Sequence, residues 1–472
     1  MAQGHMDRLS ALDVSFLTNE SSSAHMHVGG IMIFEGPPPS YDDLLTHIRS
    51  RLHLVPRFRQ RLAYPPVPTG RPFWIDDPAF NLEYHVRHSA LPAPGSEEQL
   101  RNMASRVYSQ QLDRTKPLWE LWMVQGLTRK RFALVTKTHH ALVDGVSGVD
   151  IATVLFDVQP VPEPAHPDGD WVPGPPPSAA ELLARDAVGV ARAPLRALRR
   201  LERAVEHPRE TLEQVGDATQ ALGEVGWNFA NPAPKIPINV PVGSHRRYEW
   251  VRADLAQFKR IKNALGGTVN DVVLAVVTGA MRRWLHGRGI RTEGLELRAQ
   301  VPVSIRAKDE HGHLGNRIAA VRGPLPVYVD DPVQRLGVCR EGMEGIKQSK
   351  QALGAEVISR FNDFAPPTLL AQAARVNFST RLFNMVVTNV PGPQIPLYVL
   401  GRELEDVFPV GFLPPEQALF IAIMSYNGEI NFGLLGDYDV MYDLDVVADG
   451  IEESLAELVE ASKVSQETPA PA

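Results

Sequence analysis

The sequence is poor in cysteine, has no long hydrophobic run and carries no excess of positive charge. Its single cysteine, Cys339, excludes an intrachain disulfide and a cysteine-rich metal site. The longest apolar run, residues 272–281, is about half as long as a membrane-spanning helix. The net charge is −7, from 48 basic and 55 acidic residues, so no global attraction draws the chain to nucleic acid. We therefore expect no nucleic-acid partner, and a protein that is soluble or lies on a membrane surface.

The N-terminus also lacks the charged start and the following apolar stretch that are typical of a signal peptide. Hydrophobic residues make up 44% of the chain and charged residues 22%, which is ordinary for a globular protein and excludes a disordered chain. A single cysteine fits a reducing compartment. We therefore expect a globular protein in the cytoplasm.

Proline, in contrast, is abundant: 40 of the 472 residues, about 8.5% against a usual level of about 5%. Twelve of these prolines lie in two clusters, at 160–177 and 232–241, where such density favours extended chain over helix or central strand. We expect Trp171 to pin the first cluster to a surface. The chain is therefore divided into an N-terminal lobe at 7–158, a proline-rich linker with an arginine-rich helical crossover at 159–245, a C-terminal lobe at 246–465 and a disordered tail at 466–472.

The spacing of apolar residues predicts strands and helices in both lobes, and hence an α/β fold with mixed sheets. Strands are expected over 28–34, 118–125, 132–138 and 297–305, and helices over 41–53, 98–110, 146–158, 254–265, 269–286 and 450–464. The pair Asn427-Gly428 joins two further apolar runs, 418–425 and 429–435, and predicts a hairpin with a two-residue turn.

A histidine pair, His139 and His140, directly follows one of these expected strands, and Asp144 and Gly145 come shortly after it. A histidine at a strand end suits general-base catalysis, because its unperturbed pKa of about 6.5 lies near neutral pH. Gly145 allows a tight turn or the close approach of a substrate. Two alternatives stay open at this point. One is a metal site using His140 and Asp144, for which no third ligand stands out, and the other is a pair of buried histidines without a chemical role.

The arrangement His-His-x-x-x-Asp-Gly resembles the signature of the CoA-dependent acyltransferase superfamily. The whole chain is similar to one branch of it, the bacterial wax ester synthase/acyl-CoA:diacylglycerol acyltransferase family. The motifs that carry this resemblance are Leu9-Ser10-x-x-Asp13-x-x-Phe16-Leu17, His25-Met26-His27-Val28-Gly29, Pro56-Arg57-Phe58-Arg59-Gln60, Pro117-Leu118-Trp119-Glu120, Asn270-Asp271-Val272-Val273-Leu274-Ala275, Val301-Pro302-Val303-Ser304, Leu314-Gly315-Asn316 and Thr388-Asn389-Val390-Pro391-Gly392-Pro393. One stretch, Gly411-Phe412-Leu413-Pro414-Pro415, departs from the smaller residues expected there, which puts the shape of the substrate pocket in doubt.

This resemblance implies two lobes like that of chloramphenicol acetyltransferase, packed face to face around a central tunnel. Acyl-CoA enters the tunnel from one side as a substrate, and the acyl acceptor enters from the other. The reaction uses no metal, no cofactor and no covalent acyl-enzyme. Holding both reactants in one tunnel removes the entropic cost of their meeting.

The resemblance also assigns roles to the histidine motif. His140 takes the proton from the acceptor hydroxyl, while His139 is a supporting residue that packs or forms hydrogen bonds. Asp144 gives structural support through an ion pair with an arginine, for which Arg306 is the candidate, and the alternative is a relay acid. Cys339 as an acyl-accepting nucleophile is the covalent alternative, but it lies in a helical stretch with no histidine beside it and fits a small core residue better.

Further side chains are candidates for binding and for stabilising the oxyanion. Asn270 and Asp271 begin an expected helix, where an amide and the helix N-terminus both favour negative charge. The alternative for both is helix capping near Thr268. Asn389 is a second oxyanion candidate, with turn chemistry as its alternative. Trp119 either lines the acyl tunnel or is a core residue.

We therefore expect an O-acyltransferase that moves a long-chain acyl group from acyl-CoA to diacylglycerol or a long-chain alcohol, forming triacylglycerol or wax ester. A condensation-type acyltransferase that uses a carrier protein or another hydroxyl acceptor is one alternative, and a non-enzymatic lipid-droplet binding protein is another. The arginine-rich segment at 185–209 has alternating apolar positions and fits either a solvated helix or a lipid surface. The lipid acceptors favour a peripheral place on the inner membrane face or on lipid droplets.

Overall fold

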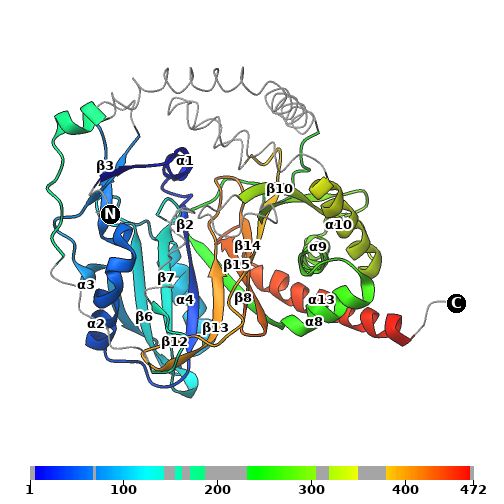
Figure 1. The fold of residues 1–472 in the computed structure, drawn as a ribbon. Coiled ribbons are helices and arrows are strands. Elements are labelled where there is room, and N and C mark those ends of the chain that lie inside the picture. Colours follow the sequence, from blue (N-terminus) through cyan, green and yellow to red (C-terminus); the bar gives the residue numbers. More distant parts are fainter. Residues whose placement is uncertain are drawn as a thin grey trace, which may run out of the picture.

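The computed structural model describes residues 6–66, 71–142, 155–161, 171–185, 231–304, 318–348 and 379–467. Within these ranges the chain forms two lobes, each built on a six-stranded sheet, and a separate three-stranded sheet. Figure 1 shows the two lobes side by side, with the N-terminal half on the left and most of the C-terminal half on the right. The α/β class with two lobes, expected from the sequence, is confirmed.

The first sheet has the strand order β12-β13-β2-β7-β6-β5. Its strands are β2 (His27–Phe34), β5 (Val86–Ala90), β6 (Trp119–Leu127), β7 (Arg131–His139), β12 (Tyr398–Val399) and β13 (Arg402–Val410). Neighbouring strands run antiparallel except β5 and β6, which are parallel. The helices of this lobe are α1 (Ala11–Asn19), α2 (Tyr41–Arg51), α3 (Leu82–His85), α4 (Glu97–Tyr108), η1 (Leu52–Leu54), η2 (Pro56–Arg59) and η3 (Thr128–Lys130).

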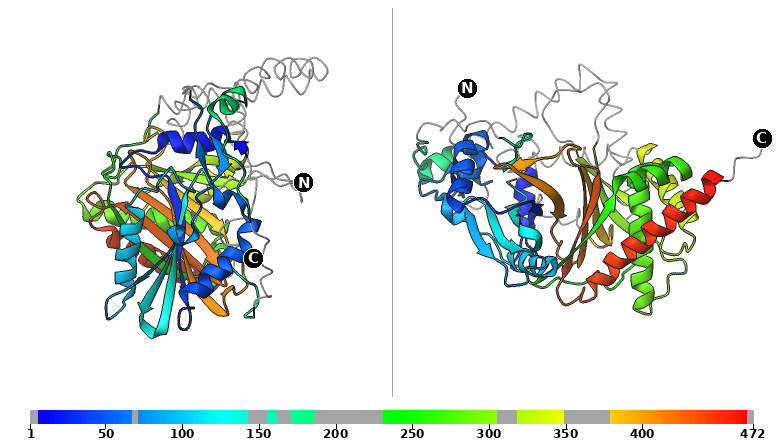
Figure 2. Two further views of the ribbon diagram at one scale, coloured as in Figure 1. Left: turned by 90° about the vertical axis from the view of Figure 1, so that its left-hand side faces the viewer. Right: turned by 90° about the horizontal axis from the view of Figure 1, so that it is seen from below.

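The second sheet has the order β10-β9-β11-β14-β15-β8. Its strands are β8 (Arg246–Asp254), β9 (Leu297–Ser304), β10 (Ile318–Leu325), β11 (Met385–Pro391), β14 (Leu419–Tyr426) and β15 (Glu429–Asp437). Four helices cover the face of this sheet that is turned away from the first lobe (Figure 2): α8 (Leu255–Leu265), α9 (Val269–Gly287), α10 (Pro332–Gln348) and α13 (Leu444–Glu467). The predicted hairpin is confirmed, because β14 and β15 pair across Asn427 and Gly428, which both have positive φ.

Two strands cross between the halves of the chain. β13 pairs with β2, and β12 pairs with β13, so both belong to the first sheet although they lie within 246–465 of the sequence. β13 also packs against β14 and β15 of the second sheet. A division of the sequence into consecutive lobes does not predict that β12 and β13 join the first sheet. These two strands tie the C-terminal half of the chain to the sheet that carries His139.

Ion pairs and stacked rings hold the two lobes together beside this exchange. Arg252 on β8 donates from Nη1 to Glu97 on α4 at 2.9 Å and from Nη2 to Asp406 on β13 at 2.9 Å. Next to it, Trp250 and Phe408 stack with ring centroids 4.3 Å apart. Bidentate guanidinium–carboxylate contacts fix orientation as well as distance. The relative position of the lobes, and with it the geometry of any site between them, is therefore set by specific contacts.

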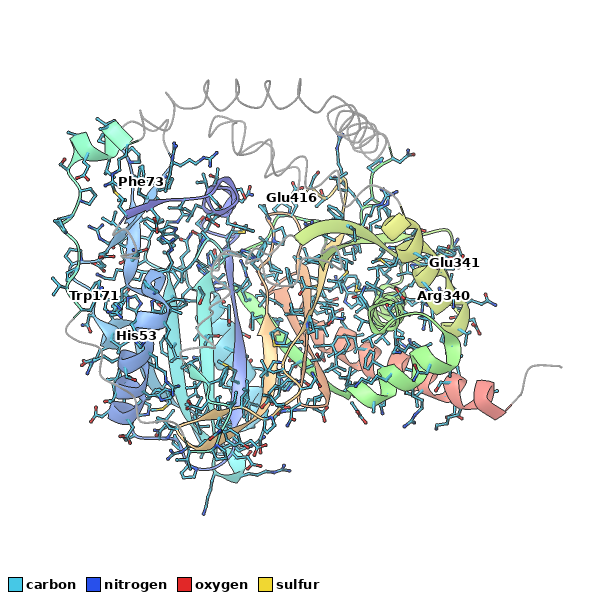
Figure 3. The ribbon with its side chains drawn as sticks, in the orientation of Figure 1. His53, Phe73, Trp171, Arg340, Glu341 and Glu416 are labelled. Atoms are coloured by element: carbon cyan, nitrogen blue, oxygen red, sulfur yellow. The ribbon has the colours of Figure 1, made fainter. Side chains whose placement is uncertain are left out.

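The small sheet, in the order β1-β4-β3, carries the start of the crossover. Its strands are β1 (Met6–Arg8), β3 (Gln60–Ala63) and β4 (Phe73–Asp76). The Gly174 N–H donates to Asp76 at 2.9 Å, and the Arg59 guanidinium lies 4.9 Å from the centre of the Trp171 ring. Leu182 is buried with Phe73 in a small apolar cluster of its own. Trp171 therefore pins the proline-rich segment to the first lobe, as predicted (Figure 3).

No single helix in the described ranges is both long and apolar enough to cross a membrane. α8 and α9 meet that test only as a pair, and they are bent by 100° relative to each other. Most of α9 is buried in the core of the second lobe, where its apolar residues pack against α10 and α13.

Candidate active site

His140 comes directly after β7, where the strand ends in a turn. Its N–H donates to the Met26 carbonyl at 2.8 Å, and the Leu142 N–H donates to the His139 carbonyl at 2.8 Å. A histidine at a strand end, predicted from the sequence, is therefore confirmed. Asp144, Gly145 and Arg306 lie outside the described residues, as does most of the helix expected over 146–158 and most of the arginine-rich segment.

Two phenylalanines from distant parts of the chain enclose the His140 ring. Phe16 on α1 stacks on it with centroids 3.9 Å apart and an interplanar angle of 22°. Phe412 meets it edge-on, with centroids 5.7 Å apart and an angle of 89°. The His140 Nδ1 atom is buried and has no hydrogen-bond partner among the described residues. The ring is thus held by apolar contacts from both halves of the chain.

This enclosure controls the protonation of His140. Burial lowers the pKa of its imidazole to about 4, and the neighbouring His139 acts in the same direction. An imidazole with such a pKa is neutral near pH 7, and a neutral imidazole is the form that accepts a proton. The geometry therefore provides a base, although a weaker one than an exposed histidine.

α1 brings Phe16 to this position because its N-terminus is fixed by a capping box. The Ser10 hydroxyl accepts from the Asp13 N–H at 3.1 Å, and the Asp13 carboxylate accepts from the Ser10 N–H at 3.2 Å. The sequence motif that begins at Leu9 contains this serine and aspartate at the capping-box spacing, a signal that predicts a helix start. The motif can be read from the sequence, but the contact between Phe16 and His140 cannot, because the two residues are far apart in the chain.

His139 takes part in the turn itself. It is fully buried, and its Nδ1 atom accepts a hydrogen bond from the Ala141 N–H at 3.0 Å. On the other side of the ring, Nε2 lies 3.6 Å from Oε2 of Glu20. The supporting role expected for His139 stays a prediction, and these contacts are the physical basis on which it can be tested.

A buried group of charged and polar side chains lies behind the histidine pair, and sequence analysis missed it. Glu20 contacts Arg114 through Nη2 at 2.5 Å and His27 through Nε2 at 3.2 Å. Burial by itself would raise the pKa of Glu20, but its contacts with His139 and His27 lower it well below the usual range. Glu20 is therefore a buried carboxylate. His27 is part of a motif quoted above, but no local pattern indicates which side chains it meets.

Asn270 and Asp271 lie in the first turn of α9. The Asp271 carboxylate accepts from both the N–H and the hydroxyl of Thr268, each at 2.8 Å, and the Asp271 N–H donates back to the Thr268 hydroxyl at 3.3 Å. The capping alternative is thus confirmed for Asp271. Gly267, just before this turn, lies next to Arg340 of α10. Figure 3 shows Arg340 on the side of the second lobe that is turned away from the first lobe. The structure gives no contact between Asn270 and His140, and an oxyanion role for Asn270 stays a prediction.

Asn389 lies in β11 rather than in a turn, and it pairs with Ile423 of β14. On the same pair of strands, Val386 pairs with Phe420, which contacts Phe412 at 5.6 Å between ring centroids. Because side chains alternate along a strand, Asn389 and Phe420 are on opposite faces of the sheet. The structure therefore does not bring Asn389 toward His140.

Trp119 is a core residue, which was one of its two open interpretations. Its side chain is buried, its Nε1–H donates to the Phe58 carbonyl at 2.8 Å, and its ring stacks on His85 at 4.7 Å. Cys339 is also a core residue, as expected. It is fully buried in α10, and burial raises the pKa of its thiol to about 12, which removes the thiolate needed for nucleophilic attack. Within the described ranges, no three histidine, cysteine or acidic side chains are grouped as metal ligands.

Two solved structures of known proteins share this arrangement of two mixed α/β lobes. A condensation domain of the calcium-dependent antibiotic synthetase has the same fold, with a TM-score of 0.58 and 15% identity over 96% of each chain. A wax ester synthase/diacylglycerol acyltransferase from Marinobacter aquaeolei VT8 has a TM-score of 0.69 and 28% identity, over 97% of this chain and 100% of that one.

Sequence comparison gives the family. Residues 9–273 match the wax ester synthase/diacylglycerol acyltransferase catalytic domain, and residues 314–459 match the C-terminal domain of the same family. Two probable diacylglycerol O-acyltransferases of Mycobacterium tuberculosis are 31% and 34% identical to this chain, each over 97% of it and over 97% and 99% of their own length. The chain belongs to the wax ester synthase/diacylglycerol acyltransferase family and is an acyltransferase, as its motifs predict.

Proposed function

We propose that this enzyme transfers a long-chain fatty acyl group from acyl-CoA to the hydroxyl of diacylglycerol or of a long-chain alcohol, with His140 as the general base. The observation that carries this proposal is the position of the His140 ring, which lies between Phe16 and Phe412 at the junction of the two lobes, where burial lowers its pKa. Apolar walls exclude water from the reacting atoms, and water would otherwise hydrolyse the thioester. The products are triacylglycerol or wax ester.

The reaction needs two proton transfers, one to His140 and one from it. His140 accepts the proton of the acceptor hydroxyl while that oxygen attacks the thioester carbonyl carbon. The resulting tetrahedral intermediate collapses, the carbon–sulfur bond breaks, and the CoA thiolate takes the proton back from His140. No cofactor and no metal enters this scheme, and acyl-CoA is consumed as a substrate.

The test is the release of CoA from palmitoyl-CoA in the presence of dipalmitoylglycerol or hexadecanol. A general base typically contributes about 10² to 10⁴-fold, so His140→Ala should lose at least 10²-fold in kcat. The matched control is His53→Ala, because His53 is an exposed histidine of the same lobe (Figure 3) and should retain activity. Full activity in His140→Ala would overturn the proposal that His140 is the general base. Loss of activity in a folded Cys339→Ala variant would support a covalent route instead.

We further propose that the enzyme works in the cytoplasm at a lipid surface, on the inner membrane face or on lipid droplets. Both acceptor classes partition into lipid, and residues 171–185 of the crossover expose apolar side chains, with Val172 73% exposed and Leu183 38% exposed. Liposome flotation of a Val172→Asp, Leu183→Asp double variant should show weaker binding than the parent. Val333→Asp, which changes an exposed valine on α10, is the control, and equal binding by all three proteins would overturn the proposal.

A further inference from the structure

The end of α1 contacts both histidines of the pair from one short stretch of chain. Phe16 stacks on His140, and Glu20, which caps the same helix, lies behind His139. The Glu20 N–H donates to the Phe16 carbonyl at 3.1 Å, so the two residues belong to one hydrogen-bonded turn. A shift of Glu20 would therefore displace Phe16 as well.

The Glu20 carboxylate is held in place although its side chain is only 1% exposed. Arg114 donates to Oε2 from Nε at 2.7 Å and contacts the same oxygen through Nη2 at 2.5 Å. Arg114 also donates to the Leu17 carbonyl at 2.7 Å, which ties the guanidinium to the last turn of α1. A buried charge is tolerated only when it is paired and hydrogen-bonded, and Arg114 provides that pairing.

The hydrogen bond from Ala141 identifies the tautomer of His139. Because Nδ1 accepts the Ala141 N–H at 3.0 Å, the neutral ring carries its proton on Nε2. This nitrogen lies 3.6 Å from Oε2 of Glu20, an electrostatic contact that is longer than a hydrogen bond. The opposite tautomer would set two N–H groups against each other and would open the turn at Ala141, which is the turn that presents His140.

We propose that Glu20 is a positioning residue for His140. It acts through His139, whose ring it holds in the Nε2–H tautomer, and it thereby fixes the turn that presents the His140 ring to Phe16. Outer groups that orient a functional histidine commonly contribute 10-fold to 100-fold to activity. The inference rests on the proposed role of His140 as the base, and it adds a second group that this role requires.

The test compares three substitutions of Glu20. Glu20→Asp keeps the charge and the pair with Arg114 but withdraws the carboxylate by one methylene, and its kcat should fall about 10-fold with KM within about 2-fold. The kcat of Glu20→Ala should fall further than that of Glu20→Asp. Glu20→Gln should stay within about 3-fold of the parent, because its amide oxygen can still accept from Arg114 and still places a partial negative charge beside His139 Nε2.

The decisive readout is the tautomer of His139, observed by NMR of protein with ¹⁵N-labelled histidine and assigned by the signal that His139→Asn removes. The Nε2–H tautomer should dominate in the parent and in Glu20→Gln, and should be mixed in Glu20→Asp and Glu20→Ala. Glu120→Gln is the control, because Glu120 is a second buried carboxylate, on β6 next to β7, and it is paired with Lys137 at 3.3 Å. It should lower the melting temperature and leave the His139 signal unchanged.

An unchanged His139 tautomer in Glu20→Asp, or an unchanged kcat in that variant, overturns the inference. If Glu20→Ala does not fold, Glu20→Asp and Glu20→Gln still decide the question. The proposed function fails separately, through CoA release by His140→Ala, whereas the tautomer measurement needs no activity at all. The two failures are therefore distinguishable.

Discussion

Phe16 and His140 stack face to face, with ring centroids 3.9 Å apart, although one lies on the first helix and the other follows β7. This contact fixes the plane of the imidazole and removes water from one of its faces. Stacked aromatic pairs contribute about 0.5–1.5 kcal/mol beyond the area that they bury. Phe16 is thus part of what lowers the pKa of the His140 imidazole.

Replacement of Phe16 should expose that face of the ring. In Phe16→Ala we expect water to reach His140 and its pKa to rise from about 4 toward the unperturbed value of about 6.5. The acid limb of the kcat/KM profile for CoA release should move upward with it. Phe34→Leu breaks another stacked pair in the same sheet, with Phe132, and should leave that limb in place. If both variants kept the profile of the parent, the stacking would have no part in the low pKa.

The pH dependence of the parent enzyme follows from the same pKa of His140, about 4. The base must be neutral, so kcat/KM should be independent of His140 above about pH 5.5 and should fall as the pH drops through about 4. The measurement is CoA release between about pH 3.5 and 8, with samples returned to pH 7 to separate titration from inactivation. A reversible limb near pH 6.5 would contradict a buried His140.

Phe412 meets His140 edge-on and contacts Phe420 of β14, so its ring fills space beside the base on the side of the second lobe. Phe412→Ala should open that space and shift the preference from hexadecanol toward bulkier acceptors such as dipalmitoylglycerol, by about 3-fold to 10-fold in the ratio of kcat/KM values. Phe258→Leu, which changes a fully buried ring that packs on Phe432, should leave the ratio unchanged. An unaltered ratio in Phe412→Ala would show that Phe412 does not limit the acceptor.

Buried histidines should also make the fold sensitive to mild acid. Burial lowers the pKa of His27 to about 3 and that of His85 to about 4. Below pH 6.5 the unfolded chain binds protons that the folded protein does not, so stability falls as the pH drops from about 6.5 toward 4. Each such histidine contributes up to about 1.4 kcal/mol per pH unit.

His85→Asn tests this directly. The His85 Nδ1–H donates to the Trp119 carbonyl at 2.8 Å, and an asparagine amide can keep that hydrogen bond without titrating. The urea midpoint measured at pH 7, 6 and 5 should fall less steeply in His85→Asn than in the parent. Parallel slopes for the two proteins would mean that His85 is protonated in the folded state as well.

Local patterns predict those elements whose apolar spacing, turn residues or cap residues can be seen in a short stretch of sequence. The apolar run at 132–138 predicts β7, Asn427-Gly428 predicts the hairpin of β14 and β15, and Thr268 predicts the start of α9, and all three are confirmed. Strands whose apolar residues are irregularly spaced, such as β8 and β13, are not predicted from the sequence. They are defined by the neighbours with which they pair and not by their own periodicity.

The sequence by itself determined that a histidine pair follows a strand, and its motifs identified the acyltransferase family. Tertiary structure alone decided what surrounds that pair. Phe16 and Glu20 reach the histidines from the end of α1, and Phe412 reaches them from a segment far along the chain because β13 crosses into the first sheet. The physical reason is that the low pKa of His140 is a property of its burial, and burial depends on which remote side chains pack against the ring.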